Sequence, residues 1–174
     1  HSSLVLGLVL GLALGLALLV LLAAAGSGPV QAQGTCDRWV LGIDASDSTD
    51  CSDETHPCRT VQYAIGQSAP GDVICVADHM LAPGPTVYQE QLQISHTLTL
   101  DGKWEAACVN PSDLTCAFTP VACDPARVVL DANGGGRVIT IQGNISPTID
   151  CFTITGGNAN TLGGDPDGMD AGGG

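Results

Sequence analysis

Hydrophobic and polar residues alternate with a period of two through much of the chain after residue 71. This period places successive side chains on opposite faces of an extended backbone, so it predicts β-strands. The predicted strands are 72–77, 88–94, 97–101, 127–131, 137–142 and 148–155. Turn-forming residues such as Asn133 to Gly136 separate them, which indicates a mainly β protein built from short strands.

A different period precedes these strands. Val61, Ala64 and Ile65 recur at the three- and four-residue spacing of one helix face. The Ala-Pro-Gly sequence at 69–71 then ends the pattern, since proline and glycine interrupt helices. The spacing therefore predicts a short amphipathic helix over 60–68 that lies on an apolar surface.

Four of the predicted strands resemble one another. Each alternates β-branched or leucine residues and ends in a turn residue: TLTLDG at 97–102, VVLDAN at 128–133, VITIQG at 138–143 and FTITGG at 152–157. Such repetition favours the stacked turns of a solenoid. An up-and-down sandwich is the alternative, but it favours two-residue turns, and only Asn133-Gly134 fits. Residues 105–125, with three Cys and three Pro, predict a surface insertion.

The N-terminal segment differs in composition from the rest. Leu4 to Ala25 is an uninterrupted apolar run, and the small residues Val30 and Ala32 precede a suitable cleavage point after residue 32. This pattern predicts a secretory signal peptide over 1–32. A retained membrane anchor is the alternative, because about 20 apolar residues can span a bilayer. The chain opens on His1, so we expect it to be truncated at its start.

Charge excludes some partners. The chain has 18 acidic residues and 5 basic ones, for a net charge of −13. The basic residues stand at five separate places: Arg38, Arg59, Lys103, Arg127 and Arg137. Nucleic acids require clustered cations, so we expect no nucleic-acid partner, and a membrane partner only through an uncleaved N-terminal segment.

All eight cysteines follow the predicted cleavage point. An even number of cysteines in an exported chain predicts disulfides, and no C-x-x-C pair suggests zinc. Eight cysteines allow roughly a hundred pairings, so the sequence leaves the connectivity open. The single local pairing we predict is Cys51 with Cys58, across a polar loop.

Two acidic stretches are candidate Ca²⁺ sites, because Ca²⁺ takes about six to eight oxygen ligands. Asp165, Asp167 and Asp170 lie in the glycine-rich stretch GGDPDGMDAGGG near the C-terminus, while aspartates also recur every third residue at 44, 47, 50 and 53. A solvated acidic loop is the alternative for both. We otherwise expect no cofactor, since the four histidines do not cluster.

Three segments carry a family resemblance: Trp39 to Asp53 (WVLGIDASDSTDCSD), Pro57 to Ile65 (PCRTVQYAI) and Ala69 to Ala77 (APGDVICVA). Shorter matches follow at 98–104, 124–125, 129–132, 136–138 and 152–158. Together they resemble the N-terminal part of secreted bacterial right-handed parallel β-helix proteins of the pectin-lyase-like superfold, over roughly residues 37–174.

The resemblance implies an all-β fold, a right-handed parallel β-helix (solenoid) with a short N-terminal capping α-helix. Residues 33–71 would hold the first strand, the cysteine loop and the capping helix. Residues 72–174 would form coils with the Cys-rich insertion at 105–125, and further coils would follow the last residue.

The shared residues are cap, core and turn positions, so the resemblance implies fold more than activity. Its polymorphic outer-membrane and adhesin-like members favour a secreted or cell-surface module without enzymatic activity, which presents loops to an extracellular glycan or a surface protein.

The alternative function is a polysaccharide lyase or glycosidase whose catalytic coils lie further along. Lyases of this superfold hold Ca²⁺ with carboxylates and use a basic residue, which would implicate Asp101 and Asp131 with Arg127 or Arg137. As residues alone, aspartates at strand ends are better explained as turn formers.

Overall fold

The computed structural model describes residues 35–43, 45–108 and 116–158, the side chain of residue 108 excepted. Every described residue belongs to one unit of the chain, Gly34–Gly174. The predicted signal peptide and the candidate Ca²⁺ ligands Asp165, Asp167 and Asp170 lie outside the described residues. Within the described part, no helix is long and apolar enough to cross a membrane.

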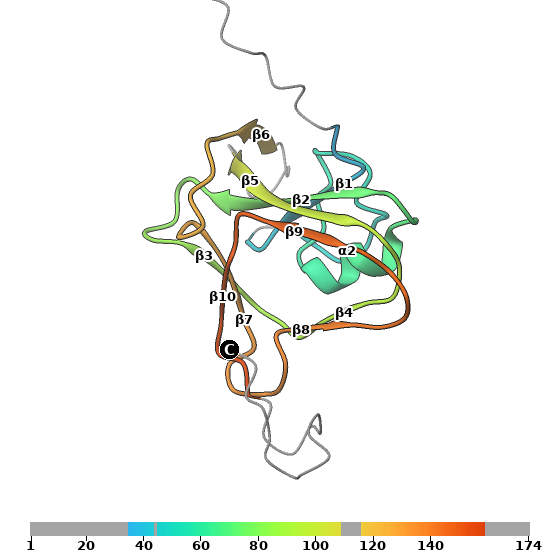
Figure 1. The fold of residues 1–174 in the computed structure, drawn as a ribbon. Coiled ribbons are helices and arrows are strands. Elements are labelled where there is room, and N and C mark those ends of the chain that lie inside the picture. Colours follow the sequence, from blue (N-terminus) through green and yellow to red (C-terminus); the bar gives the residue numbers. More distant parts are fainter. Residues whose placement is uncertain (1–34, 44, 109–115, 159–174) are drawn as a thin grey trace, which may run out of the picture. The chain divides into compact units, whose positions relative to one another are not determined.

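The described strands form three small sheets (Figure 1). The first contains β1 (Arg38–Leu41), β2 (Val73–His79), β5 (Thr99–Cys108) and β6 (Cys116–Pro120) in that order, with β9 (Thr148–Asp150) also paired to β5. The second has the order β10 (Thr153–Thr155), β7 (Val128–Asp131), β3 (Thr86–Gln89). The third pairs β4 (Leu92–Ile94) with β8 (Ile139–Ile141). All pairs are parallel except β5 with β6.

The predicted right-handed parallel β-helix solenoid is wrong. The strands lie in separate sheets of five, three and two strands, with one short helix among the described residues. In addition, β5 continues into the region predicted as an insertion and pairs antiparallel with β6. The alternation of hydrophobic and polar residues specifies which side chains of a strand are buried. It does not specify how many strands form each sheet or where the chain reverses direction.

Strand β2 is buried on both faces and separates two apolar clusters. Ile74 and Val76 face the larger cluster, which contains the inward residues of α2, β3, β4 and β7. Cys75 and Ala77 face the smaller cluster, which contains Trp104 and Ala106. A strand covered on both sides has a nearly continuous apolar sequence, and this accounts for the run VICVA at 73–77.

The predicted helix is present as α2 (Val61–Gln67). Its buried residues are Val61, Ala64 and Ile65, the three that define the apolar face, and it packs against β1, β2 and β4. At its C-terminal end, the Arg38 guanidinium donates two hydrogen bonds to the Gln67 carbonyl at 3.0 and 3.2 Å. These bonds link the end of the helix to β1.

Among the described residues, disulfides join Cys36 to Cys75, Cys51 to Cys58, and Cys123 to Cys151. The first and the last connect segments that are distant in sequence, and the second closes a local loop. No cysteine of the described residues is free. Stable disulfides form in oxidising compartments, so the folded unit belongs to an extracellular or otherwise oxidising environment.

Candidate functional site

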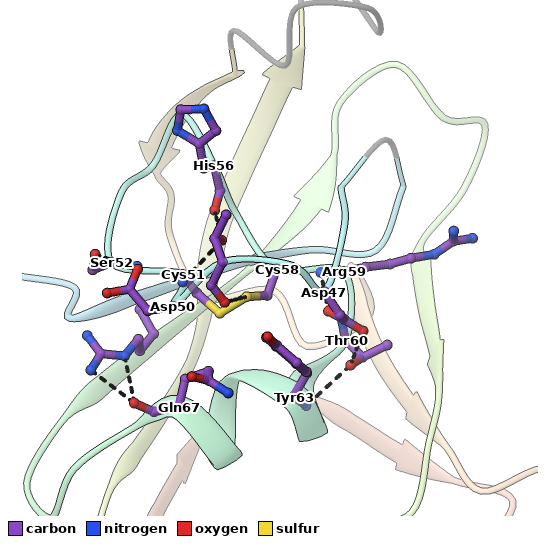
Figure 2. The surroundings of a disulfide bond; sticks show 12 residues. Asp47, Asp50, Cys51, Ser52, His56, Cys58, Arg59, Thr60, Tyr63 and Gln67 are labelled. Carbon is purple, nitrogen blue, oxygen red and sulfur yellow. Dashed lines mark hydrogen bonds between the residues drawn. A yellow bond between two sulfur atoms is a disulfide. The ribbon is translucent and has the colours of Figure 1, made fainter.

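The candidate site begins at a loop that a disulfide closes (Figure 2). Cys51 and Cys58 are fully buried, and the structure joins this pair, the local one that the sequence suggests. Strand β1 holds both ends, because Trp39 N donates to Cys51 O at 2.8 Å and Leu41 N donates to Cys58 O at 2.9 Å. We call residues 45–60 the cysteine loop. Its shape is therefore set by the disulfide and by the edge of β1.

Asp47 fastens the cysteine loop to the start of α2. Its carboxylate accepts hydrogen bonds from the Arg59 and Thr60 amides at 2.8 and 3.0 Å, and from the Thr60 hydroxyl at 2.8 Å (Figure 2). Thr60 Oγ1 in turn accepts from Tyr63 N at 3.2 Å, as an N-cap threonine does. Asp47 thus fixes the turn that leads into the helix.

The other aspartates of the cysteine loop also serve local turns. Asp50 accepts from the Ser52 hydroxyl and amide, and these bonds lower the pKa of its carboxyl. Asp53 accepts from the Thr55 amide, which lowers its carboxyl pKa in the same way. Residue 44 lies outside the described residues. Among the described side chains, no group of His, Cys, Asp or Glu has the arrangement of a metal site.

An open groove of about 260 Å³ lies between this turn and β3. Its lining residues are Gly42, Arg59, Thr60, Val87, Tyr88, Gln89 and Glu90. Arg59 and Gln89 are exposed, and Figure 2 shows the Arg59 guanidinium extending away from the disulfide. Val87 supplies an apolar patch that is 46% exposed. The groove therefore offers one cation, one amide and a small apolar surface to solvent.

Tyr88 is the buried residue beneath the groove. Its hydroxyl donates to Ala77 O at 2.7 Å and accepts from Gly42 N at 3.1 Å. Burial raises the pKa of the phenol far above its usual range, so the hydroxyl stays protonated. A Cβ at Gly42 would lie 3.1 Å from the Tyr88 ring, so a side chain at that position would require the ring to shift.

Glu90 also lines the groove. Its two carboxylate oxygens accept from Val61 N at 2.9 Å and from Gln62 N at 2.7 Å, so they satisfy the free amides at the start of α2. Burial raises the pKa of this carboxyl, while the two amide bonds oppose the rise. Glu90 therefore positions the helix against the groove.

A cluster of charged side chains lies apart from the groove. Arg127 Nε donates to Asp78 at 3.1 Å, and its Nη2 donates to Glu105 at 2.7 Å. The Asp78 carboxylate also accepts from the Thr86 hydroxyl at 2.9 Å and the Thr86 amide at 3.1 Å. These bonds to Glu105 and Asp78 raise the pKa of the guanidinium, so Arg127 links β2, β5 and the start of β7 as a cation.

The aspartates considered for lyase chemistry lie in different sheets. Asp101, on β5, contacts Lys103 Nζ at 3.4 Å and accepts from the Trp104 indole at 3.3 Å. Asp131, at the end of β7, accepts from Asn133 N at 2.8 Å within its own turn. Both carboxylates act as turn and strand-end acceptors, as the residues alone suggest.

Comparison with family models, curated proteins and solved structures finds no match. Sequence reasoning missed the groove, whose residues come from three separate segments without a common spacing. The sequence does contain one signal. Glu90 is spaced two residues from both Tyr88 and Leu92, which are buried, so the alternation places it on the inward face. A charged residue on an inward face indicates a specific partner.

Proposed function

We propose that this chain is a secreted or cell-surface structural module that binds an extracellular glycan or surface protein through the groove beside the cysteine loop. The disulfides support a location outside the cytosol.

The observation that carries the proposal is the rigid placement of an open polar groove. The disulfide and Asp47 fix one wall, and β3 with Glu90 fixes the other. Binding sites built on fixed elements lose little conformational entropy on association. Arg59 and Gln89 then have donors ready for hydroxyl, carbonyl or carboxylate oxygens, and Val87 can contact the apolar face of a sugar ring or a side chain.

A passive role agrees with how the charged groups are used. The Glu90 carboxylate is engaged by amides, and Arg127 is engaged by two carboxylates. General acid–base catalysis needs a group free to exchange a proton with a substrate. These groups serve the fold, so we assign binding and not catalysis to the groove.

A glycan array probed with the full-length, oxidised protein tests the proposal. The strongest glycan is then titrated by isothermal calorimetry against the wild type and against Arg59→Ala and Gln89→Ala. Loss of one hydrogen bond to a ligand costs about 0.5–1.5 kcal/mol, so we expect each variant to weaken binding by roughly two- to tenfold. If the array gives no hit, the same variants are tested against immobilised extracellular-matrix proteins.

Gln93→Ala is the matched control. Gln93 is an exposed glutamine on β4 that does not line the groove. Its variant should bind as the wild type does. Equal affinity for the wild type, Arg59→Ala and Gln89→Ala would place the binding surface elsewhere and contradict the proposal, as would the absence of any glycan or protein ligand.

A further inference from the structure

Strand β3 forms the edge of the second sheet, and this edge lies in the groove beside the cysteine loop. The order of the sheet ends on β3, which pairs with β7 on one side (Figure 1). Residues 87–90 of the groove belong to β3 or follow it directly, and Gly42, Arg59 and Thr60 form the facing wall. The groove is therefore bounded by the backbone of a strand as well as by side chains.

The backbone groups of Val87 and Gln89 point toward the groove. Thr86 N and Glu90 N donate to carbonyl oxygens at or next to the ends of β7, each at 3.0 Å. In a parallel pair, the residues between such donors direct their N–H and C=O groups to the opposite side. Within the described residues, no hydrogen bond joins the backbone of Val87 or Gln89 to the facing wall. Two donors and two acceptors are thus available at this edge.

The edge of β3 lacks the features that block strand pairing. Edge strands of monomeric proteins commonly carry lysine or proline, whereas β3 reads Thr-Val-Tyr-Gln. Thr86 and Tyr88 are buried, so the inner face holds the strand in place, while Val87 and Gln89 are exposed. A fixed, uncharged edge of this kind can accept a further strand.

The spacing of the available backbone groups selects a polypeptide as the ligand. Val87 and Gln89 are two residues apart, which is about 6.6 Å along a strand. An extended peptide presents matching acceptors and donors at the same interval, because its backbone has the same period. The groove volume of about 260 Å³ is also below the roughly 300–1,000 Å³ of small-molecule pockets, as expected for a shallow strand edge.

Arg59 adds a charge preference to this edge. Arg38, Lys103 and Arg127 each contact a carboxylate. Among the described residues, no carboxylate forms an ion pair with Arg59, and its side chain is exposed. A guanidinium can bind a carboxylate through two N–H groups. Because the net charge of −13 repels polyanions, the best ligand has one acidic residue among neutral ones.

We propose that the groove binds an extended segment of another extracellular protein, which adds to β3 as a further strand and places one acidic side chain at Arg59. This strand addition rests on the binding role proposed for the groove and narrows its ligand to a peptide. Backbone hydrogen bonds provide the affinity, and contacts with Arg59 and Val87 provide the selectivity.

An array of seven-residue peptides, probed with the full-length, oxidised protein, tests strand addition. Each peptide has Asp at its centre and neutral residues elsewhere, and matched peptides have Ala or Lys in place of the Asp. The strongest peptide is titrated by isothermal calorimetry. We expect it to bind roughly two- to tenfold more tightly than its Ala form. This difference should vanish in Arg59→Ala and persist in Gln93→Ala, the control outside the groove.

N-methylated forms of the strongest peptide distinguish strand addition from binding through side chains alone. Successive amides of an extended strand point to opposite sides, so methyl groups on every second amide block one side only. One of the two alternately methylated peptides should bind about tenfold more weakly or worse, and the other should bind as the parent does. Amide hydrogen exchange followed by NMR should slow at Val87 and Gln89 when the parent peptide binds.

The possible failures separate strand addition from the broader binding role. If the protein binds a glycan through Arg59 and Gln89 but no peptide, strand addition is wrong and the binding role of the groove stands. Equal affinity of the two alternately methylated peptides would have the same meaning. Peptide binding that leaves hydrogen exchange at Val87 and Gln89 unchanged would place the contact elsewhere and contradict both, as would the absence of any ligand.

Discussion

At the scale of single residues, two positions beneath the surface decide how tightly the sheets can close. Tyr88 places a neutral hydroxyl between Ala77 O and Gly42 N below the groove. Gly102 lets β9 approach β5, because a Cβ there would collide with the backbone carbonyl oxygen of Cys151. The pattern of hydrophobic and polar residues around Tyr88 and Gly102 does not reveal these roles.

Tyr88 should make the protein sensitive to alkali. The unfolded phenol ionises near pH 10, whereas burial raises the pKa of the native phenol above that value. The unfolded state therefore loses its proton first, and the stability falls as the pH rises above about 10, by up to about 1.4 kcal/mol per pH unit. Urea unfolding between pH 7 and 11.5 measures this loss.

In the variant Tyr88→Phe the free energy of unfolding at pH 7 should be about 1–3 kcal/mol lower, because Ala77 O and Gly42 N lose their hydrogen-bond partner. Between pH 10 and 11.5 its stability should fall less than that of the wild type. Lys103, whose pKa is raised mainly by Asp150, loses its contribution as the pH rises through its native pKa, equally in both proteins. An unchanged profile in Tyr88→Phe would refute the assignment.

Gly102→Ala should separate β9 from β5. The added methyl group meets Cys151 O and lies 3.2 Å from the Phe152 ring, and both belong to the connection between β9 and β10. We expect a loss of about 1–3 kcal/mol in the free energy of unfolding by urea. Gly66→Ala, within α2 and with no atom within 4 Å of its Cβ, should instead stabilise by about 0.5–1 kcal/mol. Similar effects at both glycines would contradict this view.

At the scale of elements, periodicity predicted the helix and most of the strands but not their pairing. The predicted helix 60–68 matches α2 because its apolar residues face one direction. The predicted strand 88–94 is instead divided into β3 and β4. Glu90 lies at the division, where its carboxylate turns toward the amides of α2. Glu90 and the α2 amides are far apart in sequence, so hydrophobic periodicity within one segment cannot predict their contact. The groove could not be predicted for the same reason, because its residues come from separate segments.

The disulfides should differ in their effect on stability according to the chain length that each one closes. Chain entropy assigns about 2.5 kcal/mol to a seven-residue separation and about 3.5 kcal/mol to a 28-residue separation. Cys51→Ser/Cys58→Ser should therefore cost less than Cys123→Ser/Cys151→Ser in urea unfolding. The first variant should also weaken ligand binding in the groove, because it frees the cysteine loop. The reverse order of stabilities would argue against the chain-entropy account.

At the scale of the whole described unit, ionic and covalent links join the separate sheets. Arg127 connects the second sheet to Asp78 and Glu105 of the first. Cys123–Cys151 connects the segment after β6 to the segment before β10. A sheet of two strands is marginal alone, and one of three strands needs a packed apolar face. We therefore expect cooperative unfolding to depend on these links as well as on the apolar clusters.

Arg127→Met tests the ionic link. It leaves the buried Asp78 carboxylate without its cation. We expect the free energy of unfolding to fall by about 1–3 kcal/mol. This loss is smaller than for a fully buried ion pair, because Arg127 is a third exposed. Arg59→Met, at an exposed arginine, should change stability by less than about 0.5 kcal/mol. Combining Arg127→Met with Asp78→Asn should restore part of the loss. Additive effects in this thermal or urea-based cycle would show that the two groups are not coupled.

The position of β2 between two apolar clusters has a consequence for local opening of the native state. Its amides pair with β1 and β5, and its side chains are covered on both faces, so no small fluctuation can expose them to solvent. Amide protons of Ile74 to Ala77 should exchange with deuterium only through global unfolding, whereas those of β8 and β10 should exchange through local fraying. Hydrogen-exchange mass spectrometry should therefore show β2 as the slowest segment, and its exchange rate should report the stability of the entire fold.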